Sequence, residues 1–217
     1  MSFLMSSSLR SRLTLGAVFA TTTAVLLGCS SGTQAGGGES VSPSASVSAA
    51  ITPTPTPVAA YKPATSTGRA ENVPIPALPE AAKANSKEGL EAFARYWYDL
   101  LNYGIETGDL KPIKAVTGPS CAMCIRVFPG IEKWNTDGRW IAGSRIQVQA
   151  ASSKFIETTG GSYQVVVQSE QSDGTSHNPD GSLGQRLEAS GVLGDLLIAK
   201  FVDGQWIVSN VDRLGSE

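Results

Sequence analysis

The chain has 217 residues, with 17 basic and 19 acidic side chains and a formal net charge of −2. It contains no block of like charge, so neither nucleic acid nor an anionic membrane surface is expected as an electrostatic partner. The composition changes near Pro79, and only residues 80–217 have the composition of a globular domain.

The first 28 residues have the layout of a secretory signal peptide. Arg10 and Arg12 precede an apolar run over residues 13–27, which is too short to span a bilayer comfortably. The run ends in Leu26-Leu27-Gly28-Cys29, which resembles the lipobox of bacterial lipoproteins. The resemblance implies cleavage before Cys29, a diacylglyceryl group on its sulfur, and anchoring on the extracytoplasmic face of the cell membrane. A plain secretory peptide with a chance cysteine is the alternative.

Residues 29–79 form the second expected part, a lipidated cysteine followed by a disordered linker. The segment is rich in Ser, Thr, Ala, Gly and Pro, with alternating Thr and Pro over residues 52–57. Such a composition buries too little apolar surface to offset the entropy of ordering. We therefore expect a tether that holds the globular part, residues 80–217, away from the membrane.

The globular part is predicted to open with a long amphipathic helix. Asn85 followed by Glu88 is typical of a capped helix start, and we expect the helix to begin at Ser86. Apolar residues recur at steps of three and four, and polar residues take the opposite face. The apolar positions are Leu90, Phe93, Ala94, Trp97, Leu101 and Ile105, and the polar ones are Glu91, Arg95, Asp99 and Asn102.

Shorter helical segments are predicted next. Thr107-Gly108 ends the long helix, and Asp109 can cap a short segment that runs through Val116. Ser120 is the expected N-cap of a further segment, and Pro129-Gly130 is expected to break or kink it.

Beyond Gly138 the pattern becomes strand-like. Apolar and polar residues alternate over residues 145–150 and 163–168, as in half-buried strands. Residues 172–184 are polar and contain several turn dipeptides, so we expect a mobile loop there. Strands over residues 196–202 and 206–211 flank Asp203-Gly204, the dipeptide that best fits a tight type I′ turn.

This order predicts an α+β domain, with N-terminal helices packed on one face of a curved antiparallel sheet. It is similar to the cone-shaped fold of the nuclear-transport-factor-like superfamily, in which a long helix closes over such a sheet. The helical half also resembles an uncharacterised family of actinobacterial lipoproteins. The matching residues are Ala92-Phe93 with Trp97, Asn102-Tyr103, Thr107-Gly108-Asp109, and Ser120-Cys121 with Cys124. The resemblance implies an anchored extracellular domain and supplies no activity.

Cys121 and Cys124 are the sharpest chemical feature. In an oxidising compartment the four-residue loop is expected to close as a disulfide. A redox pair is the alternative, because a cysteine at a helix N-terminus has a lowered pKa, although no strand precedes the pair as in thioredoxin-like proteins. Two thiols and one distant histidine do not complete a zinc site, so neither a metal nor another cofactor is expected.

The titratable residues favour no catalytic group. His177, the only histidine, falls in the polar loop and is expected to be solvated. Asp99 belongs to the polar helix face, and Asp109 is better explained as a cap. Glu106 lies near both in sequence, and neither Asp99 nor Asp109 has the apolar setting that would raise a carboxyl pKa towards catalytic use.

The aromatic residues are the remaining candidates. A cone-shaped fold often leaves a cavity between helix and sheet, and aromatic walls would suit a small apolar ligand. Packing of the same side chains into a filled core is the alternative interpretation. The candidate pocket residues are Tyr96, Trp97, Tyr103, Trp134, Trp140 and Trp206.

Three functional hypotheses follow. The first is a non-catalytic, lipid-anchored envelope protein that binds a small apolar ligand or another envelope protein. The second is an enzyme of the cone-fold type with Asp99 and Tyr103 as acid and base, and the third is a thiol-disulfide protein that uses Cys121 and Cys124. A cavity beneath the long helix is the observation that would favour the first two.

Overall fold

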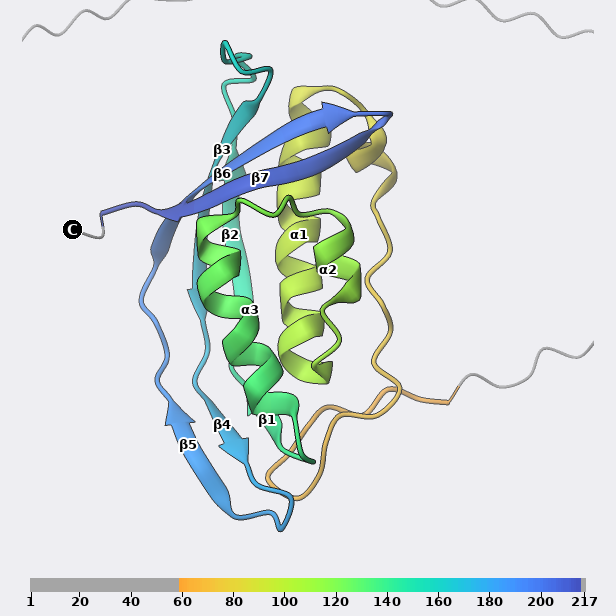
Figure 1. The fold of residues 1–217 in the computed structure, drawn as a ribbon, viewed down its shortest axis with the longest axis vertical. Helices are drawn as coiled ribbons and strands as arrows, with labels where there is room; N and C mark the ends of the chain where they lie inside the picture. The colour runs from red at the N-terminus through yellow and green to blue at the C-terminus, as the bar shows by residue number, and fades with distance from the viewer. Residues whose placement is uncertain (1–58, 216–217) are drawn as a thin grey trace, which may run out of the picture. The chain divides into compact units, whose positions relative to one another are not determined.

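The computed structural model describes residues 59–215, which form an α+β arrangement with two antiparallel sheets (Figure 1). The four-stranded sheet has the order β2-β3-β6-β7, and the three-stranded sheet has the order β1-β4-β5. The sequence predicted a single curved sheet, and the second sheet corrects that prediction. The expected signal peptide and Cys29 lie outside the described residues.

Helix α1 (Lys87–Thr107) is the predicted long helix, preceded by a 3₁₀ turn, η1 (Glu80–Lys83). Its N-cap is Ser86, whose Oγ accepts a hydrogen bond from the Gly89 N–H at 3.0 Å, so the cap lies one residue after Asn85. Gly108 ends the helix with a φ of 79°, a conformation that glycine adopts without steric cost. Both the predicted helix and its predicted end are confirmed.

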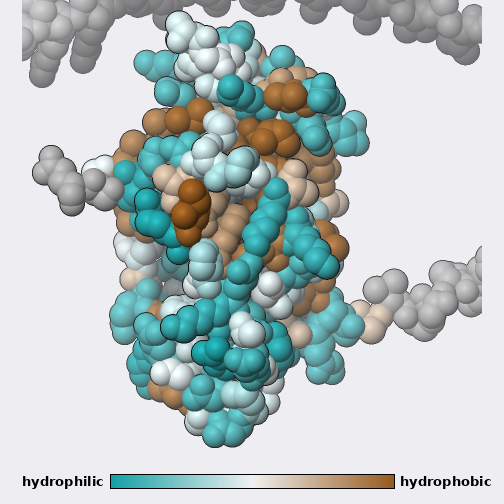
Figure 2. All heavy atoms as spheres, in the orientation of Figure 1, coloured by the Kyte–Doolittle hydropathy of each residue, from teal (hydrophilic) through white to brown (hydrophobic). Residues whose placement is uncertain are grey.

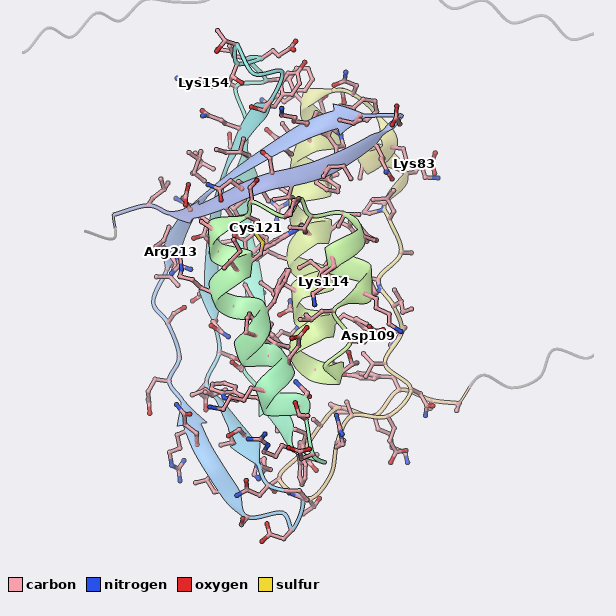
Figure 3. The ribbon with its side chains drawn as sticks, viewed as in Figure 1. Lys83, Asp109, Lys114, Cys121, Lys154 and Arg213 are labelled. Atoms are coloured by element: carbon pink, nitrogen blue, oxygen red, sulfur yellow. A yellow bond between two sulfur atoms is a disulfide. The ribbon has the colours of Figure 1, made fainter. Side chains whose placement is uncertain are left out.

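The N-cap of helix α2 (Lys111–Ala115) is Leu110, which makes no side-chain cap hydrogen bond, so the predicted cap at Asp109 is one residue too early. The Asp109 Oδ1 still accepts a hydrogen bond from the Lys111 N–H at 3.0 Å. Helix α2 packs against α1, and an ion pair connects it to α3 (Ala122–Asn135). In Figure 3 Lys114 of α2 points towards α3, and its Nζ lies 2.6 Å from the Glu132 Oε1.

Helix α3 differs from prediction at two points. Its N-cap is Cys121 instead of Ser120, and it continues through Pro129 without interruption. A proline inside a helix costs about 3 kcal/mol, because it removes one hydrogen bond and crowds the preceding turn. Burial of Phe128 and Ile131, on either side of Pro129, offsets this cost, since each such side chain contributes roughly 1.5–3 kcal/mol.

The four-stranded sheet contains the predicted strands, β2 (Ile146–Ser152), β3 (Tyr163–Gln171), β6 (Leu193–Val202) and β7 (Gln205–Arg213). Every pairing is antiparallel. Alternate residues face the helices, and Val165 pairs with Leu197 at the buried centre. Asp203 and Gly204 both have positive φ, 50° and 82°, which confirms the predicted tight turn between β6 and β7.

The three-stranded sheet contains β1 (Trp140–Gly143), β4 (Gly174–His177) and β5 (Leu183–Leu187). The predicted mobile loop over residues 172–184 is therefore wrong, because it holds all of β4 and the start of β5. The Gly181 N–H donates to the Asn178 carbonyl at 2.8 Å and closes the turn between them. Figure 2 shows mainly hydrophilic residues over this end of the molecule.

Large side chains fill the space beneath α1. The largest fully buried ones include Trp97, Trp206, Tyr98 and Phe93. The ring centroids of Phe93 and Trp206 lie 6.5 Å apart, and those of Trp97 and Tyr98 lie 5.1 Å apart. The space between α1 and the sheet is therefore a filled core and not the aromatic-walled cavity that the sequence also allowed.

One buried carboxylate joins α1 to the sheet. Asp195 is 1% exposed, and its Oδ2 accepts a hydrogen bond from the Tyr98 hydroxyl at 2.7 Å. Its Oδ1 accepts from the Arg213 Nε. Burial, followed by the charge and hydrogen bond of Asp195, raises the pKa of the Tyr98 hydroxyl. The hydroxyl therefore stays protonated and donates to the carboxylate.

Residues 59–79 lie against the helices as an N-terminal strap (Figure 1). Lys62 and Glu71 exchange two backbone hydrogen bonds of 3.0 and 2.9 Å, and the Trp140 Nε1 donates to the Thr65 carbonyl at 2.8 Å. The sequence assigned these residues to the disordered tether, so the ordered part begins earlier than predicted. Within residues 59–215, none of the helices has the length and apolar character needed to cross a bilayer.

Candidate functional site

Polar side chains of α1 cover the free edge of strand β2. Asn102, only 6% exposed, donates from Nδ2 to the Ile146 carbonyl and accepts through Oδ1 from the Ile146 N–H, both at 2.8 Å. The Arg95 Nη1 donates to the Val148 carbonyl at 3.1 Å. These contacts take the place of a neighbouring strand, because they satisfy backbone groups that an edge strand would otherwise leave unpaired.

Beside this covered edge lie three adjoining depressions, which we call together the Arg145 groove. The first has a volume of about 570 Å³ and is lined by Arg95, Asp99 and the start of β2. The second, of about 140 Å³, and the third, of about 480 Å³, lie between α1 and the strap. Arg145 lines all three.

Arg145 is exposed, and within residues 59–215 its guanidinium makes no hydrogen bond or ion pair. A guanidinium offers five donors in a planar fork that matches a carboxylate or a phosphate. The residue is therefore free to bind an anionic group that enters the groove.

Tyr61 of the strap and Glu106 of α1 form the opposite wall. The Tyr61 hydroxyl donates to the Glu106 Oε1 at 2.6 Å. Burial, the hydrogen bond and the negative charge of Glu106 raise the pKa of Tyr61 to about 12, although the positive charge of Arg145 acts the other way. This hydrogen bond ties the strap to the helix and shapes the groove.

Asp99 lines the groove at the middle of α1. Burial raises the pKa of its carboxyl group above the usual value, and the charges of Arg145 and Arg95 only partly oppose the effect. The expectation that Asp99 lacks a setting that raises its pKa is therefore wrong. Its carboxylate makes no hydrogen bond or ion pair within the described part of the chain.

The groove offers binding groups of both signs. Arg145 can bind an anion, and Asp99 can bind a cation or accept a proton. In the part of the chain that the structure describes, no cluster of three or more His, Cys, Asp or Glu side chains could hold a metal ion. The chemistry that the residues support is recognition of a polar molecule.

A protein-family model described as "Family of unknown function (DUF6318)" matches residues 59–212. The chain belongs to this family. The DUF6318 match begins at the strap, so the region that defines the family, like the ordered structure, includes residues before Glu80.

Other comparisons of the DUF6318 chain are more distant. The search of curated proteins found no match. The crystal structure of the intermembrane-space region of the chloroplast protein ARC6 is similar over 60% of this chain and 98% of that chain, at 10% identity and a TM-score of 0.43. The structure of Aln2 from a Streptomyces species is similar over 58% of this chain and 88% of that chain, at 10% identity and a TM-score of 0.36.

The predicted pocket aromatics of the DUF6318 chain do not surround one space. Trp97 and Trp206 are fully buried, and their indole N–H groups donate to the Thr117 Oγ1 and the Ala84 carbonyl, respectively. Tyr96 and Trp134 are half-buried against the core. Tyr103 lines the third depression of the Arg145 groove, beside Asp99.

Trp140, the last of the six, stacks on His177 with ring centroids 5.2 Å apart. His177 is 4% exposed, and its Nε2 lies 2.8 Å from the Thr175 Oγ1. The prediction of a solvated histidine is wrong, because β4 turns the ring inwards onto Trp140. His177 serves the packing of the three-stranded sheet.

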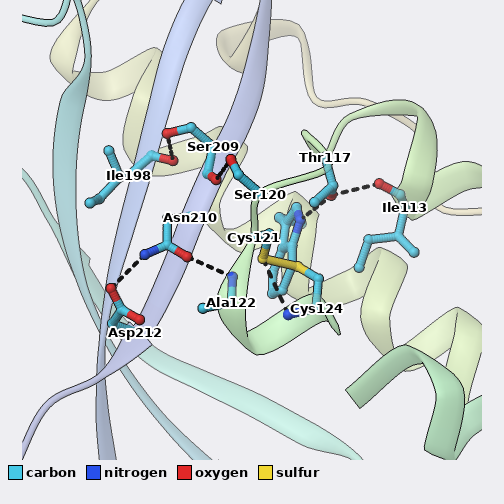
Figure 4. Close-up of a disulfide and its surroundings, with 11 residues drawn as sticks. Ile113, Thr117, Ser120, Cys121, Ala122, Cys124, Ile198, Ser209, Asn210 and Asp212 are labelled. Carbon is cyan, nitrogen blue, oxygen red and sulfur yellow. Dashed lines mark hydrogen bonds between the residues drawn. A yellow bond between two sulfur atoms is a disulfide. The ribbon is translucent and has the colours of Figure 1, made fainter. Parts of the chain in front are cut away.

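Cys121 and Cys124 form the expected disulfide, with an S–S distance of 2.02 Å (Figure 4). Both residues are buried, and their surroundings are hydrogen-bonded to β7. The Ala122 N–H donates to the Asn210 Oδ1 at 2.8 Å, and the Ser120 Oγ donates to the Ser209 carbonyl at 3.3 Å. The disulfide therefore clips the start of α3 where it meets the sheet.

Sequence reasoning missed Arg145 and Tyr61 as site residues. Arg145 lies just before β2, and in the sequence it is one of the polar residues that alternate with apolar ones in the predicted strand. Tyr61 was placed in the tether. A usable signal was the polar face of α1, since Arg95, Asp99 and Asn102 recur at steps of four and three and all reach the groove.

Proposed function

We propose that this protein is a lipid-anchored, extracytoplasmic binding module that holds a small polar ligand in the Arg145 groove without chemical turnover. The observation that carries the proposal is Arg145 itself, which lines all three depressions and whose guanidinium makes no hydrogen bond or ion pair among the described residues. Ligand sites combine a concave surface with a few polar groups that converge on it, and this groove has both.

The binding proposal is tested by NMR titration of the purified protein with a panel of small anions, cations and zwitterions. We expect at least one member to shift the amide resonances of Ile146 and Asp99, and Arg145→Gln to abolish the shift for members that carry an anionic group. Arg186→Gln is the matched control, because Arg186 is exposed on β5 and lines none of the three depressions. A panel without any such shift would contradict the proposal.

The anchoring part of the proposal rests on the lipobox-like sequence that ends at Cys29. We infer a signal peptide over residues 1–28, a diacylglyceryl group on Cys29 and an actinobacterial lipoprotein with a cone-like domain. Palmitate labelling tests the anchor. The label should be lost on Cys29→Ala, and a labelled variant would contradict the anchor.

A second candidate function is acid–base catalysis in the same groove. Asp99 and Tyr103, the acid and base considered from the sequence, line one depression, and burial raises the pKa of Asp99. Recovering each bound panel member unchanged after prolonged incubation favours binding alone. Conversion that Asp99→Asn abolishes would favour catalysis.

A further inference from the structure

We propose that the ligand of the Arg145 groove is a zwitterion with an apolar side chain, whose carboxylate meets Arg145 and whose ammonium group meets Asp99. Amino acids and short peptides have this chemistry. The inference rests on the proposed function and specifies the class of molecule that the groove selects.

Two charges of opposite sign, neither of them in an ion pair within the part of the chain that the structure describes, line the first and third depressions. Asp99 and Arg145 both border these spaces, yet they are more than 4 Å apart, since they form no ion pair within residues 59–215. Asp99 is partly desolvated, the charges of Arg145 and Arg95 only partly oppose the effect, and within residues 59–215 no hydrogen-bond donor contacts its carboxylate. A ligand ammonium group would supply that compensation, and a ligand carboxylate would satisfy the fork of Arg145.

A ligand with a single charge would fit less well. An anion held by Arg145 would also face Asp99 and Glu106, which line the third depression. A cation held by Asp99 would face Arg145 and Arg95 in the first. Since like charges that line the same space disfavour binding, only a molecule that carries both signs gains at both positions.

The strap provides an apolar wall for the rest of the ligand. Val73, Pro74, Ile75, Pro76 and Ala77 line the third depression opposite Asp99 and Arg145. Ile75 is 59% exposed, so part of its apolar surface is available for contact. An aliphatic side chain on the ligand would cover this surface.

Titration calorimetry of the purified full chain with four probes tests the inference. Leucine and leucyl-leucine carry both charges at different separations, N-acetylleucine carries only the anion, and leucinamide carries only the cation. We expect at least one zwitterion to bind about tenfold or more tightly than either singly charged probe, as for loss of one charge-assisted hydrogen bond. Tighter binding of leucine would indicate a free amino acid as the ligand, and tighter binding of leucyl-leucine would indicate a peptide.

Two variants connect the preference to its residues. Arg145→Gln should reduce zwitterion affinity to that of leucinamide, and Asp99→Asn should reduce it to that of N-acetylleucine. Arg186→Gln and Glu188→Gln, which remove the same charges outside the groove, should leave the affinity unchanged. Both site residues are exposed, and circular dichroism checks that the variants fold.

The outcomes separate this inference from the proposed function. Groove resonances that shift with a singly charged probe as strongly as with a zwitterion would overturn the inference and leave the binding function standing. Absence of zwitterion binding, or zwitterion binding unaffected by Arg145→Gln and Asp99→Asn, would also overturn the inference.

Discussion

Asn102 offers the most direct test of how α1 is joined to the sheet. Its amide makes two 2.8 Å hydrogen bonds to the backbone of Ile146 from a position that is only 6% exposed. Asn102→Ala removes both bonds and leaves an N–H and a carbonyl without partners. Asn102→Leu does the same but keeps most of the side-chain volume.

The expected loss follows from these contacts. Two hydrogen bonds contribute about 1 kcal/mol each, and each unsatisfied backbone group costs roughly 1–3 kcal/mol if water cannot reach it. Ile146 is half-buried, so water relieves part of this cost. Alanine recovers about 0.6 kcal/mol of helix propensity. We expect Asn102→Ala to lower the free energy of unfolding by about 2–3 kcal/mol.

Urea unfolding followed by tryptophan fluorescence measures the change, because Trp97 and Trp206 are buried in the folded state. Asn102→Leu distinguishes hydrogen bonding from packing. If packing dominated, leucine would restore stability, whereas loss of hydrogen bonds predicts that it remains destabilised. A leucine variant within about 0.5 kcal/mol of the parent, the usual range for neutral surface changes, would refute the reasoning.

Three further predictions use the same measurement. Tyr98→Phe should cost about 1–3 kcal/mol, because it removes a donor from the buried Asp195. Replacing Cys121 and Cys124 together by alanine should cost about 2 kcal/mol, the loop-closure entropy of a four-residue loop. Asp99→Asn should stabilise the protein at pH 7 and have little effect near pH 3. The raised pKa means that Asp99 favours folding when protonated and loses that contribution as pH rises through its folded pKa.

Each of these has a control. Tyr96→Phe, at a half-buried tyrosine whose hydroxyl makes no hydrogen bond within residues 59–215, should change stability little. A reductant should destabilise the parent but not the variant without the two cysteines. Glu188→Gln, which removes an exposed negative charge outside the groove, should change stability little at pH 7. An Asp99→Asn variant that is less stable than the parent at pH 7 would contradict the assigned effect of burial.

The parts of the fold that the sequence predicted are those with strong local signals. The apolar period of α1, the left-handed end at Gly108 and the Asp203-Gly204 turn depend on nearby residues, and the structure has each of them. The continuation of α3 through Pro129 depends on burial of Phe128 and Ile131 against other elements. Helix propensity alone predicted a break or kink at Pro129.

The same difference between local signals and contacts with distant residues explains which site residues the sequence did not predict. The strap has the composition of a tether, and its order comes from partners far away in sequence, such as Glu106 for Tyr61 and Trp140 for Thr65. Asp99 was correctly placed on the polar face of α1, but that face turned out to lie against β2 and the strap. The desolvation that raises the pKa of this exposed side chain could not be predicted without knowing what packs beside the helix.

The opposite edge of the four-stranded sheet is also occupied, and this affects how copies of the protein meet. The Val208 N–H donates to the Val116 carbonyl at 2.9 Å, and the Gly118 N–H donates to the Val208 carbonyl at 2.7 Å. With Asn102 at Ile146 and this connection at Val208, backbone groups at both outer strands already have partners. A second copy would have to break these bonds before it could extend the four-stranded sheet at Ile146 or Val208, which disfavours edge-to-edge pairing there when many copies lie close together.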